Sequence, residues 1–497
     1  MNIIDNDLLS MQEARILVEN AREAQKRLAT FPQEKLDKIV ECMIDEIQKH
    51  LKELAESSSD ETEYGKWEDK HIKNKFVCTH LKERLKGMKC VGVINEDNTE
   101  MTMDVGVPMG VIVGFCPATS PVSTTIYNAV IAIKSGNAII FSPHTRAKKT
   151  LCKTMDILIK AAEKAGLPEG ALAYLHTVSK SGSLELMNHR DTSLIMNTGV
   201  HEMLDEAYKS GKPVIYGGNG NGPAFIERTA NIENAVKDII SSKSFDYGIV
   251  SAAEQSVVVD SCIAGEVKEK IMKNGGYFMT EQESEKLATI LFDKYGDFES
   301  EMIGRSPQFL AKKAGFKVSD NVKLLISEQK YVGKNNPYSK EKLCPVLAFY
   351  IEDDWMHACE KCIELLLTER YGHTLIIHSN DKEVIRQFAL KKPVGRVLVN
   401  TAGTFGSMGA TTNFFPSMTL GSGSAGQGMT SDNVSPSNLT YIRKVGYGVK
   451  KVDDVIKELG HKDAIDSILG DNLDLNNEDT YKLLEKLLKK ILENLNK

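Results

Sequence analysis

The chain has 497 residues, which is too long for one ordinary domain, so two or three domains are expected. Hydrophobic residues make up 41% of the chain and charged residues 26%, which is typical of a globular protein rather than a disordered one. The formal net charge is only -6 and no basic block is present, so no nucleic-acid partner is expected.

Three sequence features bear on the location of the protein. No run of about 18 apolar residues exists, so no membrane span is expected. The N-terminus lacks the basic region and apolar core of a secretory signal. The 9 cysteines show no paired metal-ligand spacing, which predicts reduced thiols, mostly buried, and no metal site. A cytoplasmic protein is the expectation.

The N-terminal part predicts helices without evident chemistry. Apolar residues recur at helical spacing over residues 10–57, which predicts two amphipathic helices. Ser10 followed by Glu13 fits a capping box at the start of the first of these helices. Residues 62–88 continue as mixed helix, and all of these elements are expected to serve packing.

Strands and helices alternate from residue 92 onward. Turn residues between β-type runs predict a hairpin within residues 92–108. Residues 110–114 and 137–141 are short apolar runs typical of buried parallel strands, and strand-to-loop units follow at 173–178 and 193–199. This alternation predicts an α/β fold with a doubly wound parallel sheet, whose ligands bind at the carboxyl ends of the strands. No GxGxxG motif follows a strand, so periodicity alone indicates a nucleotide site only weakly.

The second half repeats the pattern. Strands are predicted at residues 324–326, 346–350, 374–378 and 396–400. A glycine-rich stretch from 403 to 428 is long for a loop without structure, and such loops are usually functional or disordered.

The segment KSFDYGIVSAAEQSVVVD, at residues 243–260, sets a small side chain just before a buried strand. Gly248 and the turn Ser251-Ala252-Ala253 precede the β-branched run at 257–259. Loops held by a rigid scaffold are where reactive groups tend to lie. The segment closely resembles the nucleophile loop of the CoA-acylating aldehyde dehydrogenases, which usually reads like YDNGIICSSEQS. Ser251 stands where that family has its catalytic Cys.

The resemblance covers roughly residues 10–448 and rests on several ordered motifs. They are residues 111–121 (a strand and the TNP loop), 137–149 (NxIIxxPHPxAKK), 197–200 with 207–213 (TGG and AAYSSGKP), 218–221 (GPGN), 341–346 (EKMCPV), 372–374, 396–400 and 420–423. The resemblance implies an aldehyde dehydrogenase fold, with a Rossmann-like cofactor domain, an α/β catalytic domain and a β-arm for oligomerisation.

The implied domain boundaries follow from these motifs. Residues 1–240 are expected to form the dinucleotide-binding domain, with the β-arm near residues 92–108. Residues 241–415 are expected to form the catalytic domain, and residues 416–448 a return segment of the oligomerisation arm. The implied assembly is a homodimer or a tetramer.

The resemblance also implies a reaction and a set of ligands. A Cys thiolate adds to a small aldehyde, an Asn side chain and a backbone N–H hold the oxyanion, NAD or NADP accepts the hydride, and coenzyme A displaces the acyl group as co-substrate. The implied cofactor-binding residues are Ser142, Pro143, His144, Lys148, Thr198, Gly199, Gly218, Gly220 and Glu341. His373 is implied near the acyl or CoA site. Each of these residues also has an ordinary structural explanation, such as a turn or a solvated strand end.

Two departures from the family pattern affect the chemistry directly. Ser251 replaces the Cys, and Ser120 replaces the Asn of the TNP loop, so these two serines are the predicted catalytic residues. A hydroxyl must be activated by a positioned base, and losing an oxyanion donor can cost ~10²–10³ in rate. Ser422 and Ala425 also depart from the family's LGCGSWGG, which favours natural divergence over a deliberate change at 251. Cys116, in the loop of Ser120, is either a relocated nucleophile or a packed cysteine.

Residues 449–497 form a C-terminal extension of different character. A helix from about residue 452 leads through a polar linker at 471–477 to a last helix, whose apolar side chains make one continuous stripe. Residues 478–497 resemble the encapsulation peptides of bacterial microcompartment enzymes, which bind shell proteins through a short amphipathic helix. The alternative is a helix that packs on its own domain or on a partner subunit.

Three functions remain in view. The first is an NAD(P)-dependent, CoA-acylating aldehyde dehydrogenase, associated with a microcompartment if the last helix docks on a shell. The second is a catalytically inactive paralogue that serves as a structural or assembly subunit. The third is a serine-based esterase or acyl transferase, for which the sequence shows no His base at motif distance from Ser251.

Overall fold

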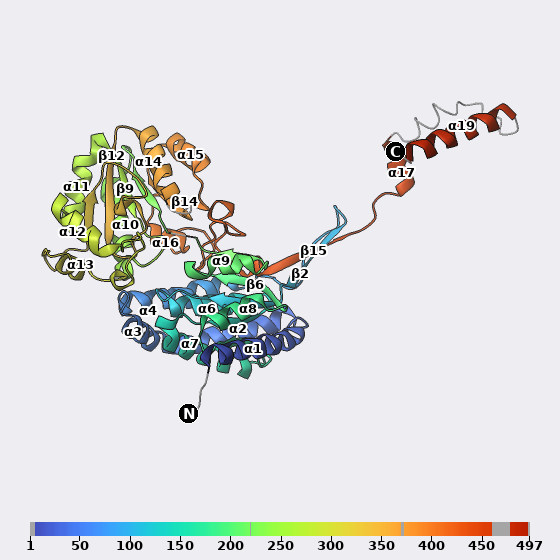
Figure 1. Cartoon of the computed structure of the whole chain (residues 1–497), viewed down its shortest axis with the longest axis horizontal. Coiled ribbons are helices and arrows are strands. Elements are labelled where there is room, and N and C mark those ends of the chain that lie inside the picture. The colour runs from blue at the N-terminus through green and yellow to red at the C-terminus, as the bar shows by residue number, and fades with distance from the viewer. Residues whose placement is uncertain (1–4, 219, 369–371, 460–477, 496–497) are drawn as a thin grey trace. The chain divides into compact units, whose positions relative to one another are not determined.

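The computed structural model describes residues 5–218, 220–368, 372–459 and 478–495 (Figure 1). Backbone contacts divide the chain into two compact units, one formed by residues 1–94 with 105–443 and the other by residues 95–104 with 444–497. Among the described helices, none is both long enough and apolar enough to span a bilayer.

The N-terminal helices are α1 (Asn6–Leu28), α2 (Gln33–Ile47), α3 (Leu51–Thr62), α4 (Trp67–Phe76) and α5 (Lys82–Leu85). Residues 10–57 therefore hold parts of three helices where two were predicted. The predicted capping box was wrong. Asp5 caps α1, whereas Ser10 is buried inside the helix and donates to the Thr177 carbonyl. Glu13 accepts from the backbone N–H groups of His176 and Thr177, so both side chains tie α1 to another part of the fold.

A five-stranded parallel sheet has the order β5-β4-β3-β6-β7. Its strands are β3 (Val111–Phe115), β4 (Ala138–Ser142), β5 (Leu172–Tyr174), β6 (Thr192–Asn197) and β7 (Val214–Tyr216). The helices of this region are α6 (Pro121–Lys134), α7 (Lys148–Lys164), α8 (Lys180–Asn188) and α9 (Leu204–Lys209). This is the strand order of a Rossmann-type sheet, which confirms the predicted α/β class.

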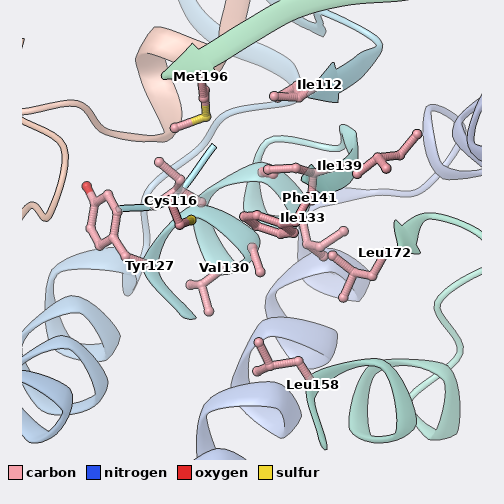
Figure 2. Packing of buried hydrophobic residues seen from close by; sticks show 14 of the residues in the cluster. Ile112, Cys116, Tyr127, Val130, Ile133, Ile139, Phe141, Leu158, Leu172 and Met196 are labelled. Atoms are coloured by element: carbon pink, nitrogen blue, oxygen red, sulfur yellow. The ribbon is translucent and has the colours of Figure 1, made fainter. Parts of the chain in front are cut away.

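Helix α6 is the centre of the first hydrophobic core. All of its side chains are buried, because the helix packs between the five-stranded sheet and the outer helices α2 and α7. Figure 2 shows Val130 and Ile133 of α6 among Ile112, Ile139 and Phe141 of the strands. Its serine, threonine, asparagine and lysine side chains are buried together with the apolar ones, so the helix has no solvated polar face.

A seven-stranded parallel sheet has the order β10-β11-β12-β9-β8-β13-β14. Its strands are β8 (Pro223–Ile226), β9 (Ser256–Asp260), β10 (Gly276–Phe278), β11 (Leu324–Glu328), β12 (Val346–Glu352), β13 (Thr374–His378) and β14 (Arg396–Val399). Its helices are α10 (Ile232–Ser244), α11 (Ala264–Lys273), α12 (Glu281–Leu291), α13 (Pro307–Lys313), α14 (Trp355–Thr368), α15 (Lys382–Lys391) and α16 (Gly403–Ser407).

Both faces of this sheet are covered. Val258 belongs to a core that includes side chains of α14, whereas Val257 and Val259 belong to a second core that includes side chains of α10 and α11. Successive strand residues point to opposite faces, which explains why β9 is apolar without alternation.

A third, smaller sheet has the order β1-β2-β15, with β1 (Gly92–Asp97), β2 (Thr102–Pro108) and β15 (Thr440–Gly446). The predicted strands within residues 92–108 are confirmed as neighbours. The C-terminal extension contains α17 (Val452–Glu458) and α19 (Glu478–Leu495), as the sequence predicts. The predicted linker at 471–477 lies outside the described residues.

Candidate active site

Ser251 lies at the amino end of β9, within hydrogen-bonding distance of a histidine. Ser251 Oγ is 3.1 Å from Nε2 of His373, which stands directly before β13. Gly220 precedes β8, and β9, β8 and β13 are neighbours in one parallel sheet, so their amino ends lie at one edge. Ligands were predicted at the carboxyl ends of strands. In this sheet the serine and the histidine are instead carried by the amino ends of the strands.

The surroundings of His373 keep the imidazole neutral. His373 is 1% exposed, and burial, together with the nearby Arg396 and His201, holds its pKa well below the ordinary value. Nδ1 lies 2.7 Å from the Thr374 hydroxyl, and the Arg396 guanidinium donates to the His373 carbonyl at 3.0 Å. The tautomer that donates from Nδ1 to Thr374 leaves the Nε2 lone pair for the Ser251 hydroxyl.

The sequence shows no His base at motif distance from Ser251, and the structure brings one from a distant part of the chain. The two residues are 122 positions apart in the sequence, so no local motif could join them. They meet because parallel strands bring their amino ends together. The resemblance placed His373 near the acyl site, but it did not indicate a hydrogen bond to the serine.

Gly220 lies against the serine loop and is hydrogen-bonded to Glu341. The Gly220 N–H donates to Glu341 Oε1 at 3.1 Å. A Cβ atom on Gly220 would lie 1.9 Å from the Ser251 carbonyl oxygen, so only glycine fits at this position. The structure thus brings four of the predicted residues together: Ser251, His373, Gly220 and Glu341.

Ser120 belongs to a buried ion cluster that sequence reasoning missed. It precedes α6 and accepts a hydrogen bond from Lys73 Nζ at 2.7 Å. Lys73 Nζ lies 2.6 Å and Lys70 Nζ 3.2 Å from the Asp246 carboxylate, and all three charged side chains are at most 3% exposed. Lysines spaced i,i+3 on a helix are usually read as a solvated face, so the sequence signal for this cluster was weak.

The ion cluster holds a strained turn before Ser251. Asp246 and Tyr247 have φ angles of 50° and 51°, and Gly248 follows at 72°. Left-handed backbone costs roughly 1–2 kcal/mol for each residue other than glycine. The Asp246 carboxylate accepts from Lys66 N, and the Asp246 N–H donates to Asp69, each at 2.7 Å. These bonds anchor the turn to the start of α4.

The carboxyl ends of the five-stranded sheet carry most of the predicted cofactor residues. Ser142 ends β4, Pro143 and His144 follow it, and Lys148 stands at the start of α7. Thr198 and Gly199 follow β6, and Gly218 follows β7. Ser142 bonds Ser183 at 2.8 Å, and Thr198 bonds Thr419 at 2.8 Å. Gly199 has φ 66°, and a Cβ atom there would meet nothing closer than Pro117 at 3.9 Å, so the edge has open space beside this turn.

Cys116 is a packed thiol at the end of β3. It is 1% exposed and lies in the first hydrophobic core (Figure 2). Burial raises its pKa to about 12. A thiol in this environment stays protonated and is a poor nucleophile, which favours the packed-cysteine interpretation. Within the described part of the chain, no group of three or more His, Cys, Asp or Glu residues could hold a metal ion.

Glu254, three residues after Ser251, makes stability depend on pH. Burial raises the pKa of its carboxyl from 4.5 to about 7, although Oε1 accepts from Gly403 N at 2.7 Å. Because the pKa of Glu254 is higher in the folded than in the unfolded protein, the folded state binds this proton more tightly. The free energy of unfolding therefore falls as pH rises from about 4.5 through about 7. We expect Glu254→Gln to gain stability relative to the unmodified protein, by about 1 kcal/mol per pH unit over that window. Urea unfolding at several pH values measures this difference, and a constant difference would contradict it.

The two sheets and the serine–histidine edge define the class of protein. The chain matches the aldehyde dehydrogenase family over residues 3–280, and it belongs to that family. Within the family, the chain is similar to acylating enzymes. The succinate-semialdehyde dehydrogenase (acetylating) of Clostridium kluyveri is 33% identical to it over 87% of this chain and 95% of that protein. The predicted resemblance is thereby confirmed.

Other similar proteins and solved structures are also aldehyde dehydrogenases. The bifunctional aldehyde-alcohol dehydrogenase of Escherichia coli K12 is 38% identical over 86% of this chain and 49% of that protein, so the chain spans about half the length of this relative. The structure of an acetylating aldehyde dehydrogenase from Geobacillus thermoglucosidasius has a TM-score of 0.88 at 40% identity, over 90% of this chain and 99% of that chain. A propionaldehyde dehydrogenase from a fucose-utilisation microcompartment of Clostridium phytofermentans has a TM-score of 0.79 at 25% identity, over 88% and 97%.

Proposed function

We propose that the chain is an NAD(P)-dependent, CoA-acylating aldehyde dehydrogenase of small aldehydes in which Ser251 carries the acyl group. The observation that carries this proposal is the 3.1 Å contact between Ser251 Oγ and His373 Nε2, at the loop where the family has its Cys. The contact supplies the positioned base that a serine nucleophile requires.

The roles of the residues follow from their geometry. His373 Nε2 takes the proton as Ser251 Oγ bonds to the aldehyde carbon. When the CoA thiolate displaces the acyl group, His373 returns this proton to Oγ, and the proton of the CoA thiol leaves to solvent. The Thr374 hydroxyl, 2.7 Å from Nδ1, keeps the ring oriented, and this role requires the tautomer that carries its proton on Nδ1. Burial, and after it the charge of Arg396, lowers the pKa of His373, so the base is weak. Ser120, held by Lys73, is the proposed oxyanion donor.

The residues present fit a dinucleotide at the carboxyl edge of the five-stranded sheet. The strand order is that of a Rossmann sheet, and Gly199 and Gly218 turn the chain there with positive φ. Ser142, Pro143, His144, Lys148 and Thr198 border this edge, and Glu341 lies beside Gly220. A bound NAD(P)+ would accept the hydride that leaves the former aldehyde carbon.

The test is NADH or NADPH formation by the unmodified protein with coenzyme A and acetaldehyde or propionaldehyde. CoA-dependent turnover that disappears in His373→Gln is the expected result. Turnover that survives this substitution would show that another group activates the nucleophile.

A second candidate function is a serine esterase or acyl transferase, and the same Ser251–His373 contact favours it. Hydrolysis needs neither NAD(P) nor an aldehyde. We expect slow release of p-nitrophenol from its acetate ester by the unmodified protein, reduced about 10²-fold or more in His373→Gln. Equal hydrolysis by both proteins would rule out this function. If the protein shows neither aldehyde turnover nor ester hydrolysis, the remaining candidate is a catalytically inactive assembly subunit.

The domain roles and partners belong to the same proposal. Residues 1–240 bind the dinucleotide, residues 241–415 catalyse, and residues 416–448 complete the subunit-joining arm of a homodimer or tetramer. Residues 449–497 form the C-terminal extension.

We place the protein in the cytoplasm, inside a microcompartment, because one similar structure comes from such a compartment and α19 is amphipathic.

Helix α19 is proposed to bind a shell protein through its apolar stripe. Tyr481, Leu483 and Leu488 are 71%, 50% and 57% exposed, which is costly for a free helix in water. We expect deletion of residues 471–497 to abolish co-purification with a shell protein while gel filtration still shows the same oligomer. A changed oligomer would show instead that the helix packs on its own assembly. Lys486→Ala, on the polar side, is the matched control that keeps shell binding.

A further inference from the structure

Cys359 and Lys392 place a thiol and an amine in contact outside the active site. Cys359 lies on α14, and Lys392 directly follows α15. Lys392 Nζ is 2.6 Å from Cys359 Sγ and 2.8 Å from the Cys359 carbonyl oxygen. The side chains are 4% and 8% exposed, respectively. The proposed reaction uses neither residue.

The contact is short for a nitrogen and a sulfur atom. An ordinary N–H···O bond measures ~2.9 Å, and sulfur is larger than oxygen. Lys392 Nζ also lies 4.3 Å from the centre of the Phe388 ring. Within the described ranges, no carboxylate forms an ion pair with Lys392. The polar partners of its amine are therefore the thiol and the backbone carbonyl of Cys359. A separation of this size can be spanned by one oxygen atom bonded to both.

We propose that Cys359 and Lys392 are an oxidation site, at which peroxide joins Sγ to Nζ through one oxygen atom. One peroxide oxidises the thiol to a sulfenic acid and releases water. A second peroxide oxidises the amine to a hydroxylamine and releases another water. Condensation of the two groups forms the S–O–N bridge and releases a third water. Two dithiol molecules reverse the reaction, restoring the thiol and the amine, releasing water and becoming two disulfides.

The geometry favours lysine over the nearest cysteine as the partner. Cys362 is one turn further along α14 and is fully buried. Helical side chains three apart have Cβ atoms ~5–6 Å apart, whereas a disulfide needs ~3.5–4.5 Å. Burial also raises the pKa of the Cys362 thiol to about 12, so it stays protonated. The sulfenic acid of Cys359 therefore meets Lys392 first.

The bridge would fasten α14 to the end of α15. It closes a loop of 33 residues, and α14 packs on β8 and β9, the strands that adjoin the Ser251 loop. A cross-link of this kind stabilises a fold chiefly by restricting the unfolded chain. We therefore expect the oxidised protein to have a higher thermal midpoint than the reduced protein, and the increase to be lost on treatment with dithiothreitol.

Peptide mapping of the full chain tests the proposal directly. Lys361 separates the two cysteines on tryptic digestion, so Cys359 falls in residues 343–361, Cys362 in 362–370 and Lys392 in 392–396. After hydrogen peroxide, we expect residues 343–361 linked to 392–396, heavier by one oxygen and lighter by two hydrogens than the two peptides. Dithiothreitol should separate them again.

Three variants decide between the outcomes. Lys392→Arg keeps the charge but lacks the primary amine, so it should lose the linked peptide, as should Cys359→Ser. Cys362→Ser is the matched control and should retain it. A link between 343–361 and 362–370 instead, or peroxide treatment that yields no peptide joined to 392–396, would overturn the proposal. The mapping does not depend on aldehyde turnover, so its failure is distinct from failure of the proposed function.

Discussion

Ser251→Cys should increase CoA-dependent NADH formation from a short aldehyde by about 10²-fold or more. A thiol ionises near neutral pH, whereas the Ser251 hydroxyl depends on proton transfer to His373, and general-base assistance is worth ~10²–10⁴ in rate. His373 is a weak base here, because burial and Arg396 hold its pKa well below the ordinary value. Steady-state absorbance of NADH with saturating CoA measures the change.

The control for this variant is Ser251→Ala, which should abolish turnover at the same saturating CoA. A Ser251→Cys protein no faster than the unmodified one would mean that the nucleophile does not limit the rate. Adding Ser120→Asn then separates two explanations. If the double variant is active, the oxyanion donor was limiting, and if it is inert toward every short aldehyde, the chain is an inactive paralogue.

Asp246→Ala should lower the free energy of unfolding by about 3–5 kcal/mol, because it leaves two buried ammonium groups without a counter-charge. Lys70 and Lys73 Nζ lie 3.2 Å and 2.6 Å from this carboxylate. Burial already lowers the pKa of Lys70 to about 8. The substitution also removes the anchor of the left-handed turn before Ser251. Urea unfolding followed by circular dichroism measures the loss.

Two comparisons isolate the cause. Asp246→Asn keeps the shape but removes the charge, so it should lose a large part of the same stability. Asp320→Ala, an exposed carboxylate, should change stability by less than about 0.5 kcal/mol. If Asp246→Ala were as mild as Asp320→Ala, the buried cluster would not contribute to the stability of the fold.

Much of the architecture could be predicted because strand and helix periodicity is strong in this chain. The runs at 110–114, 137–141 and 257–259 are continuous and apolar, since both faces of their sheets are covered. Motif order placed Ser251, Ser120 and His373 in one family pattern. The start of α1 was misplaced because Ser10, a good capping residue, is used inside the helix for a tertiary bond.

The contacts within the site could not be predicted, because they join residues far apart in the sequence. Ser251 and His373 meet through the register of neighbouring strands, and Lys73 meets Asp246 across 173 positions. Buried charge pairs of this kind carry no local pattern. Cys359 and Lys392 are likewise brought together only by the packing of α14 against the end of α15.

The central claim is that Ser251 carries the acyl group, and mass spectrometry of the protein incubated with propionyl-CoA tests it most directly. The tryptic peptide of residues 244–268 contains Ser251. We expect this peptide to gain one propionyl group in the unmodified protein and none in Ser251→Ala, with fragmentation placing the group on Ser251. An adduct on another residue, such as Cys116, or no adduct on any residue, would contradict the assignment.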